Sequence, residues 1–147
     1  MSYKPVEGRS NVSNPEGITL IDDCYNANPN SVKAALTSIS TLPGRHVAIL
    51  GDMLNLGEHS KQMHREIGEI AAQCGIDVLL CHGERARLIY DGYMSAGGAQ
   101  AQYYPLMTEL KAEIPGQIKK GDVVLVKASR GMHFEELLSL ISSLQSA

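Results

Sequence analysis

Short, uninterrupted apolar runs recur along this chain and alternate with segments in which apolar residues follow a helical period. The runs at 47–50, 78–81 and 123–126 are typical of strands that are buried on both faces of a parallel sheet. Residues 18–22 form a similar run that ends in an acid, and residues 101–104 are a weaker strand candidate. The pattern therefore predicts a strand at each of these positions.

Segments with apolar residues every three or four positions lie between the strands. The last of them carries Phe134, Leu137 and Ile141 on one face. The predicted helices cover residues 31–40, 61–74, 84–95, 108–114 and 134–144. Because strand and helix alternate through the whole chain, we expect an α/β fold: a Rossmann-like, doubly wound, mostly parallel sheet with helices on both faces.

The N-terminal region departs from this alternation. Residues 1–9 have no periodicity and are interpreted as a linker or domain edge, whereas residues 10–147 form one domain. The stretch from Asn14 to Gly17 has Pro at the second position and Gly at the fourth, as a type I turn prefers. This turn would join residues 10–13 to residues 18–22, so we expect one antiparallel strand at the N-terminus.

Composition excludes several classes of partner. The formal net charge is −3, and Lys and Arg are scattered, so we expect no nucleic acid partner. No apolar stretch approaches the roughly 20 residues that span a bilayer, and no signal peptide is evident, so we expect a cytoplasmic protein without membrane insertion. Cys24, Cys74 and Cys81 lie far apart and match no zinc spacing, which favours reduced thiols and no metal site.

A polar loop follows the first apolar run. The run closes on Asp22 and Asp23, and Tyr25, Asn26 and Asn28 come directly after it, ahead of the next helix. In α/β folds, ligands bind beyond the carboxyl ends of parallel strands. Asp and Asn are also ordinary turn residues, and for a single loop that reading is favoured. Polar clusters after the other strands shift the balance toward a binding site.

The segment after the last strand supplies positive charge. Lys127 and Arg130 flank Ser129, and Gly131 allows close backbone approach just before a helix begins. Ammonium, guanidinium and hydroxyl groups at a helix start suit a carboxylate or phosphate ligand. An ion pair between Arg130 and Glu135 is an equally good interpretation of that arginine.

Generic nucleotide motifs are missing. The sequence has no Gly-x-Gly-x-x-Gly, and the glycine pair at Walker spacing, Gly116 and Gly121, is followed by Asp122 where a lysine is required. The domain therefore lacks a phosphate-cradling loop of its own. The segment 51–57 leaves a strand at one glycine and ends at another, and His64 follows it; a lone histidine there is more often packed or capping than catalytic.

Taken together, three segments resemble the C-terminal domain of the Mur ligases. They are the acid and Asn-rich segment 22–31, the segment 51–57 with the later His64, and the Lys-Ala-Ser-Arg-Gly-Met segment 127–132. The resemblance extends from about Pro5 to the end of the chain. Within the family it is closest to members that add D-alanyl-D-alanine to a UDP-N-acetylmuramoyl-tripeptide.

The resemblance implies the last domain of a three-domain ATP-dependent amide ligase of peptidoglycan precursor synthesis. In this family the central domain holds the phosphate loop and the Mg ligands, and the N-terminal domain holds the UDP-sugar. The implied partners are ATP with Mg, the UDP-N-acetylmuramoyl-tripeptide and D-alanyl-D-alanine. We expect a monomeric enzyme, and no activity from this domain alone.

The resemblance also assigns roles residue by residue, with no self-contained catalytic group. The residues implied to contact the nucleotide are Arg9, Asp23 and Tyr25. Those implied to face the dipeptide are Asn26, Asn28, Lys127, Ser129 and Arg130. The pattern departs from the family at Asn55, where Glu is expected, and at Ala128, which is often Gly.

Two alternatives remain open. A receiver-type phosphoacceptor domain also has paired acids after its first parallel strand and a lysine after its last, and Asp52 or Asp23 would accept the phosphoryl group. Against it, the third strand ends in Cys81 and His82 rather than an acid. The other alternative is a ligand-binding fragment without chemistry.

Overall fold

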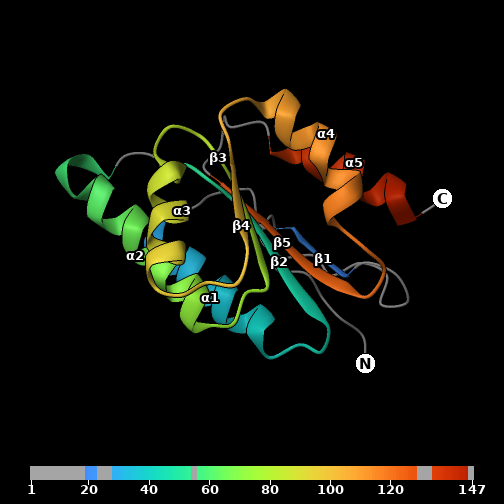
Figure 1. Ribbon diagram of the computed structural model, residues 1–147, viewed down its shortest axis with the longest axis horizontal. Coiled ribbons are helices and arrows are strands. Elements are labelled where there is room, and N and C mark those ends of the chain that lie inside the picture. The colour runs from blue at the N-terminus through green and yellow to red at the C-terminus, as the bar shows by residue number, and fades with distance from the viewer. Residues whose placement is uncertain (1–18, 23–27, 54–55, 129–133, 146–147) are drawn as a thin grey trace.

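The structure is a computed structural model that describes residues 19–22, 28–53, 56–128 and 134–145. Within these residues, five strands alternate with five α-helices (Figure 1). The strands are β1 (Thr19–Asp22), β2 (Arg45–Gly51), β3 (Val78–His82), β4 (Ala101–Tyr104) and β5 (Asp122–Lys127). The helices are α1 (Pro29–Ser40), α2 (Ser60–Gln73), α3 (Ala86–Ser95), α4 (Met107–Gln117) and α5 (Glu135–Gln145), with a 3-10 turn, η1 (Gly57–His59), before α2.

The strands form one sheet in the order β1-β5-β2-β3-β4. Every strand pair among the described residues is parallel. The mostly parallel sheet is therefore confirmed, but the antiparallel N-terminal strand is not borne out. Strand β1, which falls within the predicted partner strand at 18–22, pairs in parallel with β5, and residues 10–13 lie outside the described part of the chain.

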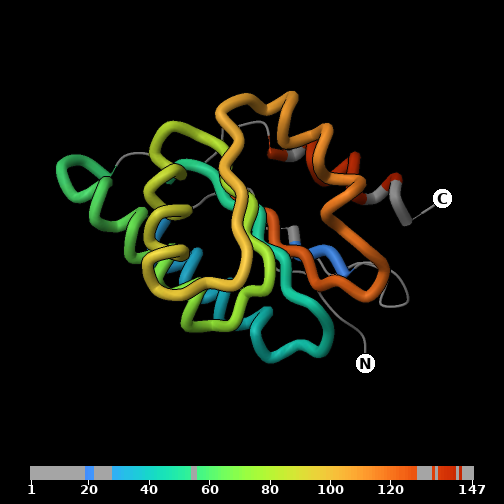
Figure 2. Tube along the Cα trace, viewed as in Figure 1, coloured from blue at the N-terminus to red at the C-terminus, as the bar shows by residue number. Residues whose placement is uncertain are grey.

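Helices cover both faces of the sheet, as the doubly wound prediction requires. Helices α1, α2 and α3 lie on one face, and α4 and α5 lie on the other, as the tube in Figure 2 also shows. Successive residues of a strand point to opposite faces. In β5, Leu125 accordingly packs in the core under the first layer, whereas Val124 and Val126 pack in the core under the second. We call these the α1–α3 side and the α4–α5 side.

Helix boundaries differ from the predictions by a few residues. Helix α1 begins at Pro29, because proline is well suited to the first helical position. The second helix begins at Ser60, directly after η1 and one residue before the predicted start at residue 61. Helix α4 continues past Pro115 to Gln117, three residues beyond the predicted end at 114.

Helices α2 and α3 pack with their backbones in contact. A Cβ atom at Gly68 would overlap the carbonyl oxygen of Ile89, and one at Gly92 would overlap the carbonyl oxygen of Arg65. Each helix thus contributes one glycine where the other helix's backbone passes. Only glycine permits this approach, because any side chain would force the helices apart.

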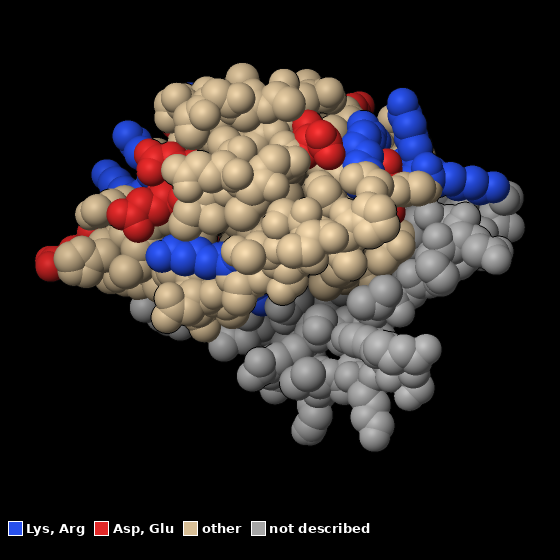
Figure 3. Space-filling model, turned by 90° about the horizontal axis from the view of Figure 1, so that it is seen from below, with Lys and Arg blue, Asp and Glu red and all other residues tan. Residues whose placement is uncertain are grey.

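The described surface carries mixed charge. Figure 3 shows one face, on which basic side chains lie toward both ends with acidic side chains among them and uncharged residues between. No helix within the described ranges is both long enough and apolar enough to cross a membrane.

Candidate functional site

The carboxyl ends of the parallel strands meet along one edge of the sheet, where the sequence predicts the ligand site. The register aligns Leu50 with Lys127, Gly51 with His82, and His82 with Tyr104. On the far side of β5, Asp22 lies opposite Val126. The polar strand ends predicted from the sequence therefore do come to one edge.

The structure describes Asn28 and Lys127 among the predicted site residues. The predicted residues that lie outside the described part of the chain are Arg9, Asp23, Tyr25, Asn26, Ser129 and Arg130. Their ligand contacts stay predictions.

Asn28 caps the N-terminus of α1. Its Oδ1 accepts a hydrogen bond from the Ser31 amide at 2.9 Å, and the Ser31 hydroxyl accepts one from the Asn28 amide at 3.1 Å. This reciprocal pair satisfies backbone donors that the first helical turn leaves free. Asn28 is exposed at the carboxyl edge, so its cap fixes the start of the helix that follows the Asn-rich loop.

Lys127 is the last residue of β5 and is 1% exposed. It lies in the interior of the sheet, because β5 is flanked by β1 and β2. Strand alternation gives it the same face as Leu125, on the α1–α3 side. A lysine is almost never fully buried without paired or hydrogen-bonded partners. Its burial at a strand end is typical of a functional or architectural charge rather than a solvated surface lysine.

Asp52 anchors the start of α3. Its Oδ1 accepts hydrogen bonds from the backbone amides of Arg85, at 2.9 Å, and Ala86, at 2.8 Å. The Arg85 guanidinium lies 3.6 Å from the other carboxylate oxygen, and Asp52 is only 5% exposed. Negative charge is favoured at a helix N-terminus, so the loop after β2 is fixed to α3. Sequence reasoning missed this role, since the partner residues lie far along the chain.

His64 holds the same loop from the other side. Its Nδ1 donates to the Ser60 carbonyl oxygen at 2.7 Å, and its Nε2 accepts from the Met53 amide at 2.9 Å. These two bonds require the neutral imidazole with the proton on Nδ1. The side chain is fully buried, and that burial lowers its pKa. The packed, structural interpretation of His64 is therefore confirmed.

Phe134 packs against Gly51 at the carboxyl edge of the sheet. A Cβ atom at Gly51 would lie 2.7 Å from the Phe134 ring and 2.8 Å from the Ala128 side chain. The ring also stacks on His82, with centroids 6.2 Å apart and an interplanar angle of 24°. The His82 Nδ1 hydrogen-bonds the Tyr104 carbonyl oxygen at 2.9 Å. A glycine at position 51 is therefore needed for this close packing. The sequence alone does not reveal this reason for the glycine.

The strand order bears on the receiver alternative. Receiver-type sheets have the order 2-1-3-4-5, in which the last strand is at the edge. Here β5 lies between β1 and β2. Asp52, one of the two acids considered as the phosphoacceptor, is already engaged by two backbone amides and is nearly inaccessible. The receiver alternative is not supported.

Metal-binding and thiol chemistry find little support in the described residues. Within those ranges no group of three His, Cys, Asp or Glu side chains could hold a metal ion. Cys74 and Cys81 are free thiols there, and complete burial raises the pKa of Cys81 well above its ordinary value. A buried thiol of high pKa is unreactive, so Cys81 serves the core.

Comparisons with known proteins show which family and which proteins this chain is similar to. The family described as Mur ligase, glutamate ligase domain, matches residues 8–130. The UDP-N-acetylmuramoyl-tripeptide--D-alanyl-D-alanine ligase of Bacillus subtilis is 32% identical over 130 residues, covering 86% of this chain and 28% of that protein. The same ligase of Escherichia coli is 37% identical over 123 residues, covering 84% of this chain and 26% of that protein.

Solved structures agree. The MurF ligase of Thermotoga maritima, solved in complex with ADP, has a TM-score of 0.80 and 30% identity, covering 99% of this chain and 33% of that one. A MurF structure from Acinetobacter baumannii has a TM-score of 0.78 and 27% identity, covering 98% of this chain and 32% of that one. The chain thus spans less than a third of the curated relatives it matches.

Proposed function

This chain belongs to the Mur ligase family, and we propose that within a longer enzyme it is the domain that holds D-alanyl-D-alanine and closes over ATP. The observation that carries the proposal is the match to D-alanyl-D-alanine-adding ligases over nearly the whole chain, with a TM-score of 0.80 to a MurF ligase. The convergence of the polar strand ends on one sheet edge supports a ligand site there.

The proposed reaction joins the dipeptide to the UDP-N-acetylmuramoyl-tripeptide. The tripeptide carboxylate takes the γ-phosphoryl group of ATP, and the amine of D-alanyl-D-alanine attacks the resulting acyl phosphate. An amide forms, and ADP, phosphate and a proton are released. Catalysis of this kind depends on positioning and charge stabilisation, so this domain contributes by orienting the amine.

We propose that one set of residues along the carboxyl edge binds the nucleotide and another set binds the dipeptide. The residues assigned to the nucleotide are Arg9, Asp23 and Tyr25, and those assigned to the dipeptide are Asn26, Asn28, Lys127, Ser129 and Arg130. Two described features support the dipeptide half. Ala128 and Phe134, which precede and follow residues 129–133 in the sequence, are both buried against Gly51 at the carboxyl edge.

The nucleotide requires more than this chain supplies. The sequence has no phosphate-cradling loop, and the described residues contain no group of three metal-ligating side chains. We therefore assign Mg and most phosphate contacts to the rest of the longer enzyme, and propose that this domain alone turns over no ATP. We further propose a cytoplasmic, monomeric enzyme, because its substrates are ATP and a UDP-linked precursor.

A domain exchange tests the proposal. This chain would replace the corresponding region of the Escherichia coli ligase, which is its 37% identical relative. We expect ATP-dependent conversion of UDP-N-acetylmuramoyl-tripeptide and D-alanyl-D-alanine to the pentapeptide, measured by mass spectrometry. Arg130→Ala in the hybrid should raise the KM for the dipeptide roughly 10- to 150-fold, since it removes a charge-assisted contact, with little change for ATP.

Calorimetry on the chain by itself guards against a hybrid that fails only at its new domain junction. We expect ADP to bind with a dissociation constant of roughly millimolar, since the phosphate cradle is missing. A hybrid without ligation, together with no binding of ADP or dipeptide to the isolated chain, contradicts the proposal. If Arg130→Ala weakens all three substrates equally and lowers the melting temperature, the arginine is an ion-pair residue.

A further inference from the structure

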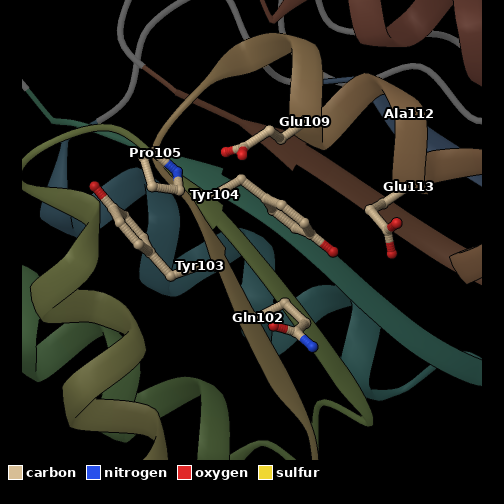
Figure 4. Close-up of a pocket in the computed structure, with 7 residues that line it drawn as sticks. All are labelled: Gln102, Tyr103, Tyr104, Pro105, Glu109, Ala112 and Glu113. Atoms are coloured by element: carbon tan, nitrogen blue, oxygen red, sulfur yellow. The ribbon is translucent and has the colours of Figure 1, made fainter.

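A groove lies between β4 and α4, at the edge of the sheet farthest from β1. Its volume is about 440 Å³. Gln102 and Tyr104 come from β4, and Glu109 and Glu113 come from α4; Figure 4 shows these side chains on the two sides of the groove. Strands β5, β2 and β3 separate it from β1, so it is distinct from the Asn-rich loop that follows that strand.

The hydroxyl group of Tyr104 is the unusual feature of the groove. Tyr104 is only 8% exposed, and its hydroxyl oxygen is buried without a hydrogen-bond partner. The Gln117 side chain approaches it without reaching hydrogen-bond geometry. In Figure 4 the hydroxyl lies between Gln102 and Glu113. A buried hydroxyl without a partner is costly, so it needs an explanation.

The charge of the groove is one-sided. Glu109 and Glu113 are exposed, and none of the residues lining the groove is basic. One oxygen of Glu109 accepts a hydrogen bond from the Leu106 amide at 3.2 Å, in the first turn of α4. The ion pairs found among the described residues include neither glutamate. Burial and the nearby Glu113 carboxylate both raise the pKa of Tyr104.

We infer that this groove binds a primary ammonium group. An ammonium carries three hydrogen-bond donors, and Tyr104, Gln102 and Glu113, which all line the groove, each offer an acceptor oxygen. Glu109 adds a second negative charge beside them. The ligand would give the Tyr104 hydroxyl the partner that the protein does not supply. Gln102 and Glu113 are exposed, so their side chains can turn aside to admit it.

The same chemistry can come from two sources: a free alkylamine, or the lysine side chain of a peptide or partner protein. A neutral or anionic ligand of equal length lacks the charge that the two glutamates require. A peptide would add backbone contacts along β4, which is an edge strand and pairs with β3 alone among the described strands. The two sources therefore differ in affinity but not in the atoms that recognise the ammonium.

Titration of the chain by NMR at low ionic strength tests the inference. The probes are n-butylamine, which mimics a lysine side chain, and n-butyrate and n-butanol as anionic and neutral controls. We expect saturable shifts of the backbone amides of Gln102 and Ala112 with the amine and none with either control. A second pair of probes, Ac-Gly-Lys-Gly-NH₂ and its norleucine analogue, separates the sources. Tighter binding of the lysine peptide than of butylamine indicates a peptide ligand, and equal binding indicates a free amine.

Matched variants locate the site. Tyr104→Phe should weaken amine binding roughly three- to tenfold by removing one hydrogen bond, and Glu113→Gln should weaken it roughly fivefold by removing a charge. Tyr90→Phe and Glu58→Gln are the controls, because Tyr90 lies on α3 and Glu58 on η1, and neither lines the groove. Equal shifts with butylamine and butanol overturn the inference. So does amine binding that survives unchanged in both groove variants.

Discussion

Two buried tyrosines on opposite sides of the sheet differ in the hydrogen bonds that their hydroxyl groups make. On the α1–α3 side, the Tyr93 hydroxyl donates to the Ile76 carbonyl oxygen at 2.5 Å and accepts from the Ala99 amide at 3.1 Å and the Gln100 amide at 3.3 Å. On the α4–α5 side, the Tyr104 hydroxyl is buried without a hydrogen bond. One hydroxyl organises a turn, and the other is left unpaired beside a groove.

The contrast extends to neighbouring groups. Asp52 and His64, both buried toward the α1–α3 side, each make two hydrogen bonds to backbone atoms. Their polar atoms serve the architecture, because each fixes a loop or a helix start. Tyr104 has no such role. A buried polar group with a full set of protein partners serves the structure, whereas one without them remains able to accept a hydrogen bond from a ligand.

The largest effect is expected at Tyr93. Tyr93→Phe leaves one carbonyl and two amides near residues 76, 99 and 100 without their partner, and should lower the free energy of unfolding by about 3 kcal/mol. Urea denaturation followed by circular dichroism measures this change. Tyr90→Phe, on the same helix and partly exposed, is the control. A loss below about 1 kcal/mol would mean that water replaces the hydroxyl and that the hydrogen bonds on the α1–α3 side contribute less to stability than expected.

Asp52 should come next. Asp52→Ala removes the acceptor for the first amides of α3, so we expect a loss of about 2 kcal/mol in the free energy of unfolding. Glu58→Ala, at an exposed position on η1, should change it by less than about 0.5 kcal/mol. Hydrogen exchange gives the sharper readout. Faster exchange confined to the Arg85 and Ala86 amides is expected, and uniform acceleration along the chain argues against a local cap.

The stability contributed by His64 should depend on pH. Burial lowers the pKa of His64 in the folded chain below the ordinary histidine value of 6.5, so the unfolded chain binds more protons in the interval between the two values. Stability is therefore full above about pH 6.5 and falls as the pH drops below that value. The nearby charges of Asp52 and Arg85 act in opposite directions on this pKa.

Thermal melts between pH 5 and pH 8 check this expectation. His64→Gln should flatten the fall below about pH 6.5 and cost about 1 kcal/mol at pH 8, where it disturbs the bond from Met53. His59→Gln, with a largely exposed side chain, should leave the profile unchanged. An unaltered profile in the His64 variant assigns the pH dependence to other groups.

The smallest effects are expected at Tyr103 and Tyr104. They test most directly whether the Tyr104 hydroxyl is unpaired. Tyr103→Phe removes a 3.0 Å hydrogen bond to the Gly83 carbonyl oxygen and should cost about 1 kcal/mol. Tyr104→Phe removes an unpaired hydroxyl and should be neutral or slightly stabilising. The two residues are adjacent on one strand, so chemical denaturation of the pair isolates the hydrogen bond. A clear loss of stability in the Tyr104 variant would mean that the hydroxyl has a protein partner after all.

Local sequence patterns predict the elements of this fold well. Strand β4 has the bounds predicted for it, Ala101–Tyr104, and β2, β3 and β5 extend only slightly beyond their apolar runs. Periodicity reports burial of one face, which is a local property. It says nothing of which strands are neighbours. The insertion of β5 between β1 and β2 depends on contacts such as that between Thr19 and Val123, which no short window contains.

The candidate site also has features that the sequence predicts and features that it does not. The sequence predicts Asn28 and Lys127 as site residues because it shows which residues follow a strand or precede a helix, and their ligand contacts stay predictions. The predicted start of α1, residue 31, is two residues late, although Pro29 at the first helical position signals it. The tasks of Asp52 and Gly51 stayed hidden, because their partners, Arg85 and Phe134, are brought to them only by the assembled sheet.

The glycine contacts between α2 and α3 have a mechanical consequence. Because Gly68 and Gly92 each lie against the other helix's backbone, the two helices cannot slide past one another without a carbonyl oxygen blocking the way. Asp52 couples the loop after β2 to α3, and His64 couples it to α2. Asp52 and Met53 thus tie both helices to the end of β2. A displacement of either helix is therefore expected to move the other helix and the end of β2 with it.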